Sequence, residues 1–443
     1  MRRARPAARF THVDRVEVNL WGTLAGVVVL DPGYGYYAFR FTPAFQASGV
    51  DPSPIHMPVA ADRTFLFTDL PEATYRRLPA MLADALPDDF GNALIDRYMA
   101  ERGISAQQVT ALDRLAYMSS RGMGALTFRP PRGPNIGSSR PVELARLVGE
   151  ARNALTGQFG DDDEAGAALR SIIEVGTSAG GARAKAVIAW NRETQEIRTG
   201  SYAAPKGFEH WLLKFDGVGA DRELGETEHY GRIEYAYFLM ARAAGIAMME
   251  CRLLEENGRA HFMTKRFDRE ASDVRHHVQS FCALAHLDYK KKGTNAYSQL
   301  FVTIDDLGLP YSDREEAFRR MVFNVMARNC DDHTKNFAFR LRQRTAWELA
   351  PAYDITFAHN PRGEWTHQHL MSVNGKFKEV TEADLLAEAE RFAIGTAPRV
   401  IREVRAALGK WPACARAAGL SADQTRRIAR QLLTLETRRR RRT

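Results

Sequence analysis

The feature that most constrains this sequence is a polar segment, N-C-D-D-H-T-K-N, at residues 329–336. Apolar residues recur at helical spacing before it, over residues 318–326, and a strand-like apolar run follows it at 337–341. So many polar groups are too costly to bury together, and we expect the segment to be a loop. A loop held between two rigid elements is a common place for catalytic groups.

The acids and amides around this loop suit phosphoryl transfer, which needs a phosphate cradle, a cation on the phosphates, ligands for Mg²⁺ and a carboxylate near the attacking hydroxyl. Asp331 and Asn336 have the spacing of the base and the metal-binding amide in the H-R-D-x-x-x-x-N loop of protein kinases. Asp354, after the apolar run 347–351, suits Mg²⁺, which binds through one or two carboxylates plus substrate phosphates. The alternative stays open that Asp331 caps a turn and Asp354 caps a helix.

The candidate phosphate cradle is the glycine-rich segment 176–185, G-T-S-A-G-G-A-R-A-K. Its glycines permit the backbone to approach an anion closely. Gly176 and Gly181 fit the G-x-x-x-x-G spacing, but Ala182 stands where a P-loop requires lysine, so a P-loop is excluded. An ordinary turn explains the segment equally well.

Lys214 lies inside an apolar, strand-like run at residues 210–215. A buried ammonium is costly unless it is paired, so we expect it to meet ATP phosphates and a helix carboxylate, for which Glu234 is best placed. The alternative is an edge-strand lysine that reaches solvent along its stem. Residues 264–267 end a predicted hairpin where a kinase hinge would offer backbone groups to adenine, although an ordinary strand end explains them equally well.

Composition is that of a globular protein without a membrane span. The chain has 443 residues, 45% hydrophobic and 26% charged, which excludes a disordered chain. The longest apolar stretch, 20–30, is too short to cross a bilayer, and the N-terminus lacks the features of a secretory signal. We therefore expect a cytoplasmic protein. The arginine run at 438–442, part of a net charge of +8, is expected to be a solvated tail.

Cysteine and histidine spacing predicts neither disulfides nor zinc. The four cysteines stand far apart without a C-x-x-C pair and are expected to be reduced core thiols. His367 and His369 form an H-x-H pair. The sequence beside them has no cluster of cysteines or carboxylates that would complete a metal site, so we favour an ordinary loop or strand pair over a zinc site.

Hydrophobic periodicity predicts an α+β protein. Residues 16–41 alternate as a β-meander, and 72–155 have helical periodicity, with one helix over 78–86. Ser312 and Glu315 fit a capping box that would open the helix before the polar loop. Further strands are expected at 186–190, 197–203, 210–215, 249–255 and 261–266, with a helix at 227–244 and mostly helices after 278.

Six segments, taken in order, resemble the successive signatures of HipA kinases, a family of bacterial serine/threonine kinase toxins. They are S-A-G-G-A-R-A-K, L-L-K-F, I-E-Y-A-Y-F-L-M-A-R-A-A-G-I, T-K-R-F-D-R, D-D-H-T-K-N and A-Y-D-I. The resemblance is strong over 171–355 and looser over 16–130. It implies a two-lobed, protein-kinase-like α+β fold, with a HipA N-terminal-like subdomain (1–130), a strand-rich nucleotide-binding lobe (131–267) and a mainly helical catalytic lobe with a basic tail (268–443).

The resemblance also implies roles for individual residues. Asp331 would be the catalytic base, Asn336 and Asp354 would bind Mg²⁺, and Ser178 would be autophosphorylated. Adding negative charge to a phosphate cradle would oppose ATP binding, so this modification would inactivate the protein. Arg183 departs from some relatives, which carry an acidic residue there. The remaining ATP-site residues would be Ser178, Gly180, Gly181, Lys214, Glu234, Thr264, Lys265, Arg266, Phe267, His333 and Lys335, with His333 shaping the loop.

The implied activity is an ATP- and Mg²⁺-dependent serine/threonine protein kinase that acts as a toxin. An aminoacyl-tRNA synthetase is a candidate target, a helix-turn-helix antitoxin the implied partner, and DNA contact would come mainly through that antitoxin. One alternative is a small-molecule kinase of the aminoglycoside or lipid type, which uses similar Asp and Asn residues. Another is a non-catalytic protein that bridges an antitoxin on DNA, although such a protein has no reason to keep Asp331, Asn336, Asp354 and Lys214 together.

Overall fold

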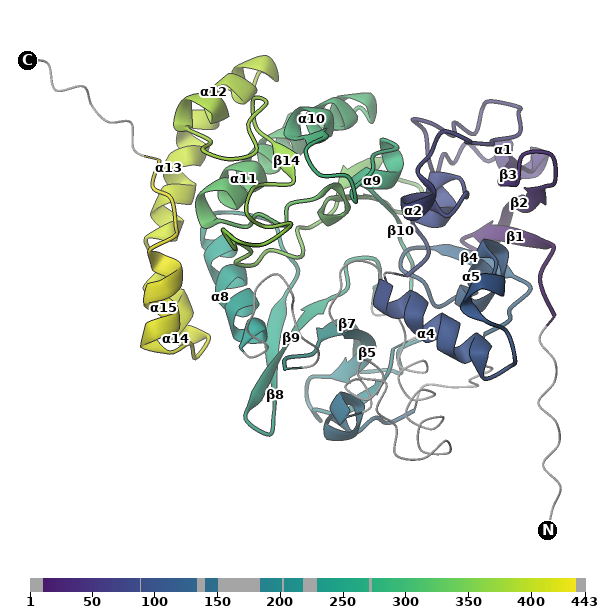
Figure 1. The fold of residues 1–443 in the computed structure, drawn as a ribbon, viewed down its shortest axis with the longest axis horizontal. Helices are drawn as coiled ribbons and strands as arrows, with labels where there is room; N and C mark the ends of the chain where they lie inside the picture. Colours follow the sequence, from purple (N-terminus) through teal and green to yellow (C-terminus); the bar gives the residue numbers. More distant parts are fainter. Residues whose placement is uncertain are drawn as a thin grey trace, which may run out of the picture. The chain divides into compact units, whose positions relative to one another are not determined.

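The structure is a computed structural model that describes residues 11–87, 89–133, 140–149, 184–200, 203–217, 229–270 and 273–435. The chain forms two compact units, whose helices and strands are labelled in Figure 1. The first comprises Met1–Leu213, Asp268–Gln279 and Leu341–Thr345, and the second comprises Lys214–Phe267, Ser280–Arg340 and Ala346–Thr443. Lys214 and the polar loop therefore belong to the same unit.

The first unit begins with the predicted β-meander. β1 (Arg15–Leu20), β2 (Thr23–Asp31) and β3 (Tyr36–Phe41) pair antiparallel in sequence order. A fourth strand, β4 (Leu126–Arg129), pairs antiparallel with β1. β4 lies inside the stretch expected to be helical, so that expectation was wrong here. Four residues with alternating buried side chains are enough to extend an existing sheet, but too short to stand out from the surrounding helical periodicity.

The helices of the first unit are short. The helix expected over 78–86 is only α3, because Pro79 precedes its first turn and the chain leaves the helix after Ala83. Two of the predicted strands pair as an antiparallel ladder, β5 with β6. The elements are α1 (Pro43–Gln46), α2 (Glu72–Tyr75), α3 (Ala80–Ala83), α4 (Asp89–Ala100), the 3₁₀ turn η1 (Ala106–Gln108), α5 (Ala111–Met118), β5 (Lys185–Asn191), β6 (Ile197–Thr199), β7 (Phe208–Lys214) and β10 (His277–Ser280).

The second unit contains a predicted helix followed by a predicted hairpin. The helix is α8 (Tyr230–Ala243), and the hairpin joins β8 (Cys251–Glu256) to β9 (Arg259–Lys265). Asn257 and Gly258 both have positive φ, 45° and 79°, as a two-residue turn between twisted strands requires. The hairpin prediction is confirmed.

The rest of the second unit is mainly helical, as expected. Figure 1 shows α13 alongside α11, and α14 packs on α8. The polar segment 329–336 forms a loop between α11 and β12, as predicted. The elements are α9 (Phe281–Leu284), β11 (Asn295–Ala296), α10 (Tyr297–Asp306), α11 (Tyr311–Ala327), the 3₁₀ turn η2 (Thr334–Asn336), β12 (Ala338–Leu341), β13 (Trp347–Leu349), β14 (Met371–Ser372), α12 (Glu382–Arg391), α13 (Ala397–Leu408), α14 (Trp411–Ala417) and α15 (Ala422–Ala429).

The predicted capping box at the start of α11 was wrong, although the helix itself is present. α11 begins at Tyr311 after Pro310, which cannot provide a side-chain cap. Glu315 instead forms ion pairs with Arg319 and Arg399. Among the described residues, no helix is both long and apolar enough to cross a membrane.

Candidate functional site

Lys214 lies between two carboxylates that come from distant parts of the chain. Its Nζ is 2.5 Å from Oε1 of Glu234 on α8, and it also pairs with Oδ1 of Asp354. The Lys214 side chain is only 15% exposed, so the alternative of a solvent-reaching lysine is excluded. The expected pairing of Lys214 with Glu234 is confirmed, and Asp354 joins it. We call these three residues the Lys214 triangle.

The local fold of α8 holds Glu234 at this position. Asp216, just after β7, accepts hydrogen bonds from the amides of His229 (3.1 Å) and Gly231 (3.5 Å), so it satisfies the otherwise unpaired start of the helix. Gly231 permits close packing, because a Cβ there would lie 2.0 Å from the carbonyl oxygen of Ala260 on β9. The helix therefore rests directly on the backbone of the hairpin, with Glu234 buried on the same side.

The Lys214 triangle places two carboxylates beside one ammonium. Burial alone would lower the pKa of Lys214, but attraction to Asp354 and then to Glu234 outweighs burial and raises it. The ammonium is therefore charged at neutral pH. Asp354 is the more exposed of the two acids, and so the one that a cation from solvent can reach.

The two adjacent acids of the polar loop have opposite environments. The Asp332 side chain is fully buried and accepts hydrogen bonds from the hydroxyl of Tyr297 (2.7 Å), the amide of Leu370 (2.7 Å) and Nδ1 of His369 (2.9 Å). The Asp331 side chain is 49% exposed. Asp332 therefore anchors the loop, and Asp331 is the acid that is open to solvent.

His369 is a residue of the site's support that the sequence analysis missed. The H-x-H pair was considered only as a metal site or as a loop or strand pair, whereas the structure places His369 on Asp332, with Sγ of Cys330 3.9 Å from its Nε2. Burial would lower the pKa of His369, but the carboxylate of Asp332 raises it to about 10. The H-x-H pair was the signal in the sequence that could have pointed to His369. Its partner Asp332 lies 37 residues earlier in the chain, so spacing alone could not predict the contact.

One hydrogen bond ties the segment of Asp354 to the polar loop. The hydroxyl of Tyr353 donates to the carbonyl oxygen of Lys335 at 2.7 Å. Asn336 lies next to that carbonyl, and its Nδ2 donates to the backbone oxygen of Asp331 at 2.7 Å. Asn336 directly follows Lys335, and Asp354 directly follows Tyr353. The bond between Tyr353 and Lys335 therefore holds together the segments that carry the two candidate metal ligands.

Two further loop residues, His333 and Lys335, pack against the ring of Tyr289, which the sequence did not single out. The Nζ of Lys335 lies 5.0 Å from the ring centroid of Tyr289, and the rings of His333 and Tyr289 are 5.4 Å apart. Nε2 of His333 is 3.8 Å from Oδ1 of Asp331, which is too long for a hydrogen bond. The role of His333 in shaping the loop stays a prediction.

The residue types at the site fit Mg²⁺ bound together with a nucleotide. Asp354 offers a carboxylate, and Asn336 has committed its amide nitrogen to the loop, which leaves its oxygen as the atom to offer a cation. Across the described ranges there is no cluster of three or more His, Cys, Asp or Glu residues arranged for a metal. Mg²⁺ does not require such a cluster, because it keeps water and phosphate ligands.

The remaining predicted site residues lie at the end of β9 or outside the described residues. Thr264 and Lys265 end β9, and Arg266 is buried just beyond it. The carbonyl of Phe267 accepts a hydrogen bond from Arg340 (2.8 Å), and its ring stacks on Tyr353 at 5.8 Å. The predicted cradle residues Ser178, Gly180 and Gly181 and the arginine run 438–442 lie outside the described residues.

Comparisons with known proteins agree with this architecture. Residues 16–129 match the HipA N-terminal domain, and residues 177–435 match the HipA-like C-terminal domain. Among solved structures, the chain resembles HipA from the Shewanella oneidensis MR-1 toxin–antitoxin system, solved as a complex of HipA, HipB and operator DNA. The TM-score is 0.66 at 15% identity, over 94% of this chain and 96% of that chain.

A weaker likeness links the chain to the proinflammatory kinase CtkA of Helicobacter pylori, with a TM-score of 0.34 at 15% identity, over 50% of this chain and 84% of that chain. No curated protein matches the chain. The likeness to the Shewanella protein confirms the expected α+β, HipA-like fold. Because the HipA-like C-terminal domain alone matches more than half of the sequence, the chain belongs to the HipA family.

Proposed function

We propose that this chain is an ATP- and Mg²⁺-dependent serine/threonine protein kinase. The observation that carries the proposal is the Lys214 triangle, joined to the polar loop through the bond between Tyr353 and Lys335. It provides a charged lysine for phosphates, oxygen ligands for a divalent cation and a solvent-accessible carboxylate within one compact unit. These are three of the four parts that phosphoryl transfer requires.

Each residue of the site has a distinct role in the proposed reaction. Lys214, held charged by Glu234, contacts the ATP phosphates. Asp331 accepts the proton of the attacking hydroxyl, which its exposure permits. Asn336 and Asp354 hold Mg²⁺, which neutralises charge on the phosphates when it is bound. Asp332 and His369 keep Asp331 in place and do not touch the substrate.

The fourth part, the phosphate cradle, is proposed to be the glycine-rich segment 176–185, with adenine contacts at residues 264–267. Ser178 is the proposed site of autophosphorylation, and its modification would oppose ATP binding through added negative charge. The match to the HipA-like C-terminal domain starts at residue 177 and so includes Ser178.

The proposed partners follow from the family and from the complex of the Shewanella HipA with HipB and operator DNA. We propose a toxin that works in the cytoplasm, is neutralised by a helix-turn-helix antitoxin, and reaches DNA mainly through that antitoxin. An aminoacyl-tRNA synthetase is the candidate protein target.

The test is transfer of radiolabel from γ-labelled ATP to the protein itself and to added protein acceptors, with Mg²⁺ present or removed by a chelator. Asp331→Asn keeps the shape of the side chain but removes the base, and we expect its rate to fall about a hundred- to ten-thousandfold. Asp306→Asn, an exposed acid at the end of α10, is the matched control and should label as the wild type does. Equal labelling of all three proteins would refute the proposal.

The form of the labelled product separates protein kinases from the two alternatives. Phosphoserine or phosphothreonine in an acid hydrolysate supports the proposal. Label that appears only on small hydroxylated molecules would instead indicate a small-molecule kinase, and a wild type without any transfer would indicate a non-catalytic binding protein.

A further inference from the structure

The two acids of the Lys214 triangle are held in place by the same helix, α11, through its N-terminal half. Asp313, Glu316 and Arg320 are spaced three and four residues apart and so share one face of this helix. The C-terminal end of α11 leads directly into the loop that carries Asp331. One helix therefore contacts the segments that lie close in sequence to Asp354 and at the end of α8, and it leads into the loop that carries Asp331.

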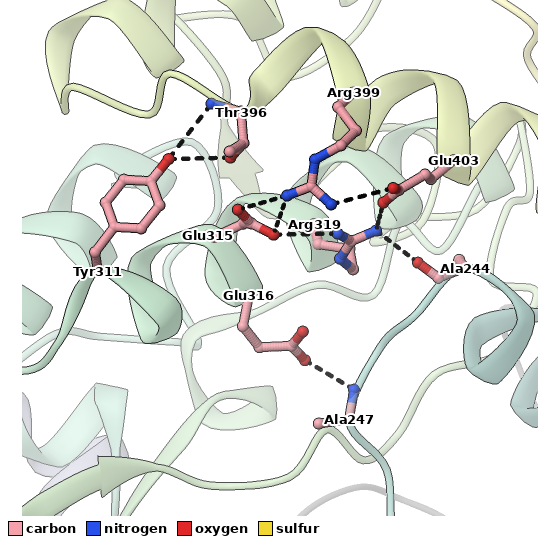
Figure 2. Close-up of polar contacts among 9 residues, drawn as sticks. All are labelled: Ala244, Ala247, Tyr311, Glu315, Glu316, Arg319, Thr396, Arg399 and Glu403. Carbon is pink, nitrogen blue, oxygen red and sulfur yellow. Dashed lines mark hydrogen bonds and ion pairs between the residues drawn. The ribbon is translucent and has the colours of Figure 1, made fainter.

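Glu316 is the central contact on this face. Its Oε1 accepts a hydrogen bond from the amide of Ala247 at 3.0 Å, shown in Figure 2, and a second from Nε of the buried Arg320 at 2.8 Å. Ala247 in turn accepts, through its carbonyl oxygen, a hydrogen bond from the amide of Ala352 at 2.8 Å. Asp354 lies two residues after Ala352, so the chain of bonds runs from Glu316 to the metal-ligand segment.

The same face also holds the start of that segment. Oδ2 of Asp313 accepts a hydrogen bond from the amide of Leu349 on β13 at 3.1 Å. Met248, the residue after Ala247, forms a parallel bridge with Ala352. Residues 349–352 are therefore fixed to α11 at one end and to the 247–248 segment at the other.

A neighbouring ion-pair network fixes the end of α8. Arg319 donates to the carbonyl oxygen of Ala244 at 2.8 Å and to Glu403 on α13 at 2.6 Å, and it also pairs with Glu315 (Figure 2). Arg399 on α13 closes the network by binding both Glu315 and Glu403. Because Ala244 directly follows α8, the network holds the C-terminal end of the helix that carries Glu234.

We infer that Glu316 is a positioning residue for phosphoryl transfer, which aligns Asp354 with Lys214 through the backbone of Ala247 and Ala352. This inference rests on the proposed function of the site. Glu316 touches none of the three residues of the Lys214 triangle in the contacts described above, so it acts on them only through the chain. Arg319 supports this alignment by binding the carbonyl oxygen of Ala244, three residues before Ala247.

Replacement of Glu316 by two different residues separates positioning from charge. Glu316→Ala removes the acceptor of both hydrogen bonds, whereas Glu316→Gln keeps an oxygen at the Oε1 position and removes only the charge. We expect Glu316→Ala to lower kcat about ten- to hundredfold, since small displacements of a reacting geometry have effects of this size. Glu316→Gln should restore most of this loss.

A second measurement does not depend on kinase activity. Hydrogen exchange of the Ala247 and Ala352 amides, followed by mass spectrometry of the peptides that contain them, should be about tenfold faster in Glu316→Ala. Arg426→Gln is the matched control, because it breaks an exposed ion pair with Asp423 within α15 that involves neither the Arg319 network nor residues 244–248. Its exchange at Ala352 and its kcat should equal those of the wild type.

Two results would overturn the inference. One is unchanged exchange at Ala352 in Glu316→Ala, and the other is the same loss of kcat in Glu316→Gln as in Glu316→Ala. A general loss of stability would raise exchange throughout the second unit and would also count against a positioning role. If the wild type transfers no phosphate, the proposed function fails, and the exchange data alone decide whether Glu316 aligns the segment.

Discussion

At the scale of single residues, Asp331 and Asp332 are adjacent in sequence, but the first side chain is half exposed and the second is fully buried. We expect Asp331→Asn to abolish most activity while changing stability by no more than about 0.5 kcal/mol, as is usual for an exposed side chain. Asp332→Asn should instead destabilise the fold by about 3–5 kcal/mol, because it leaves the buried His369 without its counter-ion. Thermal denaturation of both variants, beside a labelling assay, measures the two effects.

The two variants serve as controls for each other. An Asp332→Asn protein with wild-type melting temperature would show that the buried network does not hold the loop. An Asp331→Asn protein that melts much earlier than the wild type would show that this acid has a structural role.

The buried pair of His369 and Asp332 also predicts a pH dependence of stability. Folding raises the pKa of His369 from its ordinary value of about 6.5 to about 10. The stabilising contribution is therefore complete below about pH 6.5 and is lost as the pH rises through about 10. We expect the melting temperature of the wild type to exceed that of His369→Gln most near pH 6, and the difference to shrink toward pH 10. A difference that stays constant across this range would contradict the assignment.

Residue pairings could be predicted from the sequence only where the cost of burial demanded a partner. A lysine inside an apolar strand had to meet an anion, and Glu234 on the next helix was the nearest candidate. The contacts of Asp354 with Lys214 and of His369 with Asp332 join residues far apart in the chain, and local periodicity contains no information about them. The choice of Asp331 over Asp332 as the base followed motif spacing and stays a prediction, and Asp331 is the more exposed of the two acids.

At the scale of elements, the contact of α8 with the β8–β9 hairpin sets the position of Glu234. Gly231→Ala would place a methyl group 2.0 Å from the carbonyl oxygen of Ala260, so the helix must move. We expect a loss of about 1–3 kcal/mol in the free energy of unfolding and a lower kcat, because Glu234 moves with the helix. Denaturant unfolding and the labelling assay measure these changes.

The matched control is Gly395→Ala, since a Cβ at Gly395 would meet no heavy atom within 4 Å. Its stability should remain within about 0.5 kcal/mol of the wild type. If Gly231→Ala behaved like this control, close packing of α8 on the hairpin would not be what positions Glu234.

Elements with a long, uniform pattern were predictable, and short or irregular ones were not. The β-meander, α8, the hairpin and α11 all have clear periodicity or a characteristic turn, and all are present. β4 was hidden in a helical stretch, because its pairing with β1 depends on a partner about a hundred residues earlier. The capping box at Ser312 had the correct residue types, but Pro310 had already set the start of the helix.

At the scale of the whole molecule, nucleotide binding should stabilise the folded chain. A ligand that binds only the folded state adds about 2.7 kcal/mol when it is present at a hundred times its Kd. We expect ATP with Mg²⁺ to raise the melting temperature of the wild type by several degrees. Asp354→Asn should lose the part of this rise that requires Mg²⁺, and Lys214→Met should lose most of it. Equal shifts in all three proteins would place the nucleotide away from the Lys214 triangle.

The family could be recognised from the sequence because six short motifs occur in a fixed order, although no one of them is decisive. The structural likeness extends over nearly the whole chain at only 15% identity, so the fold tolerates replacement of most of its residues. The predicted three-domain division of the chain stays a prediction, and the two compact units of the structure are discontinuous in sequence, since the first includes the distant segments Asp268–Gln279 and Leu341–Thr345.

The most direct test of the central claim is a crystal structure with a non-hydrolysable ATP analogue and Mn²⁺, which stands in for Mg²⁺ and is located by its anomalous scattering. We expect the ion to bind the carboxylate of Asp354 and the amide oxygen of Asn336, with Lys214 on the phosphates and Asp331 facing the terminal one. An ion and nucleotide bound away from Asp354 and Asp331 would contradict the claim that these residues form one phosphotransfer site.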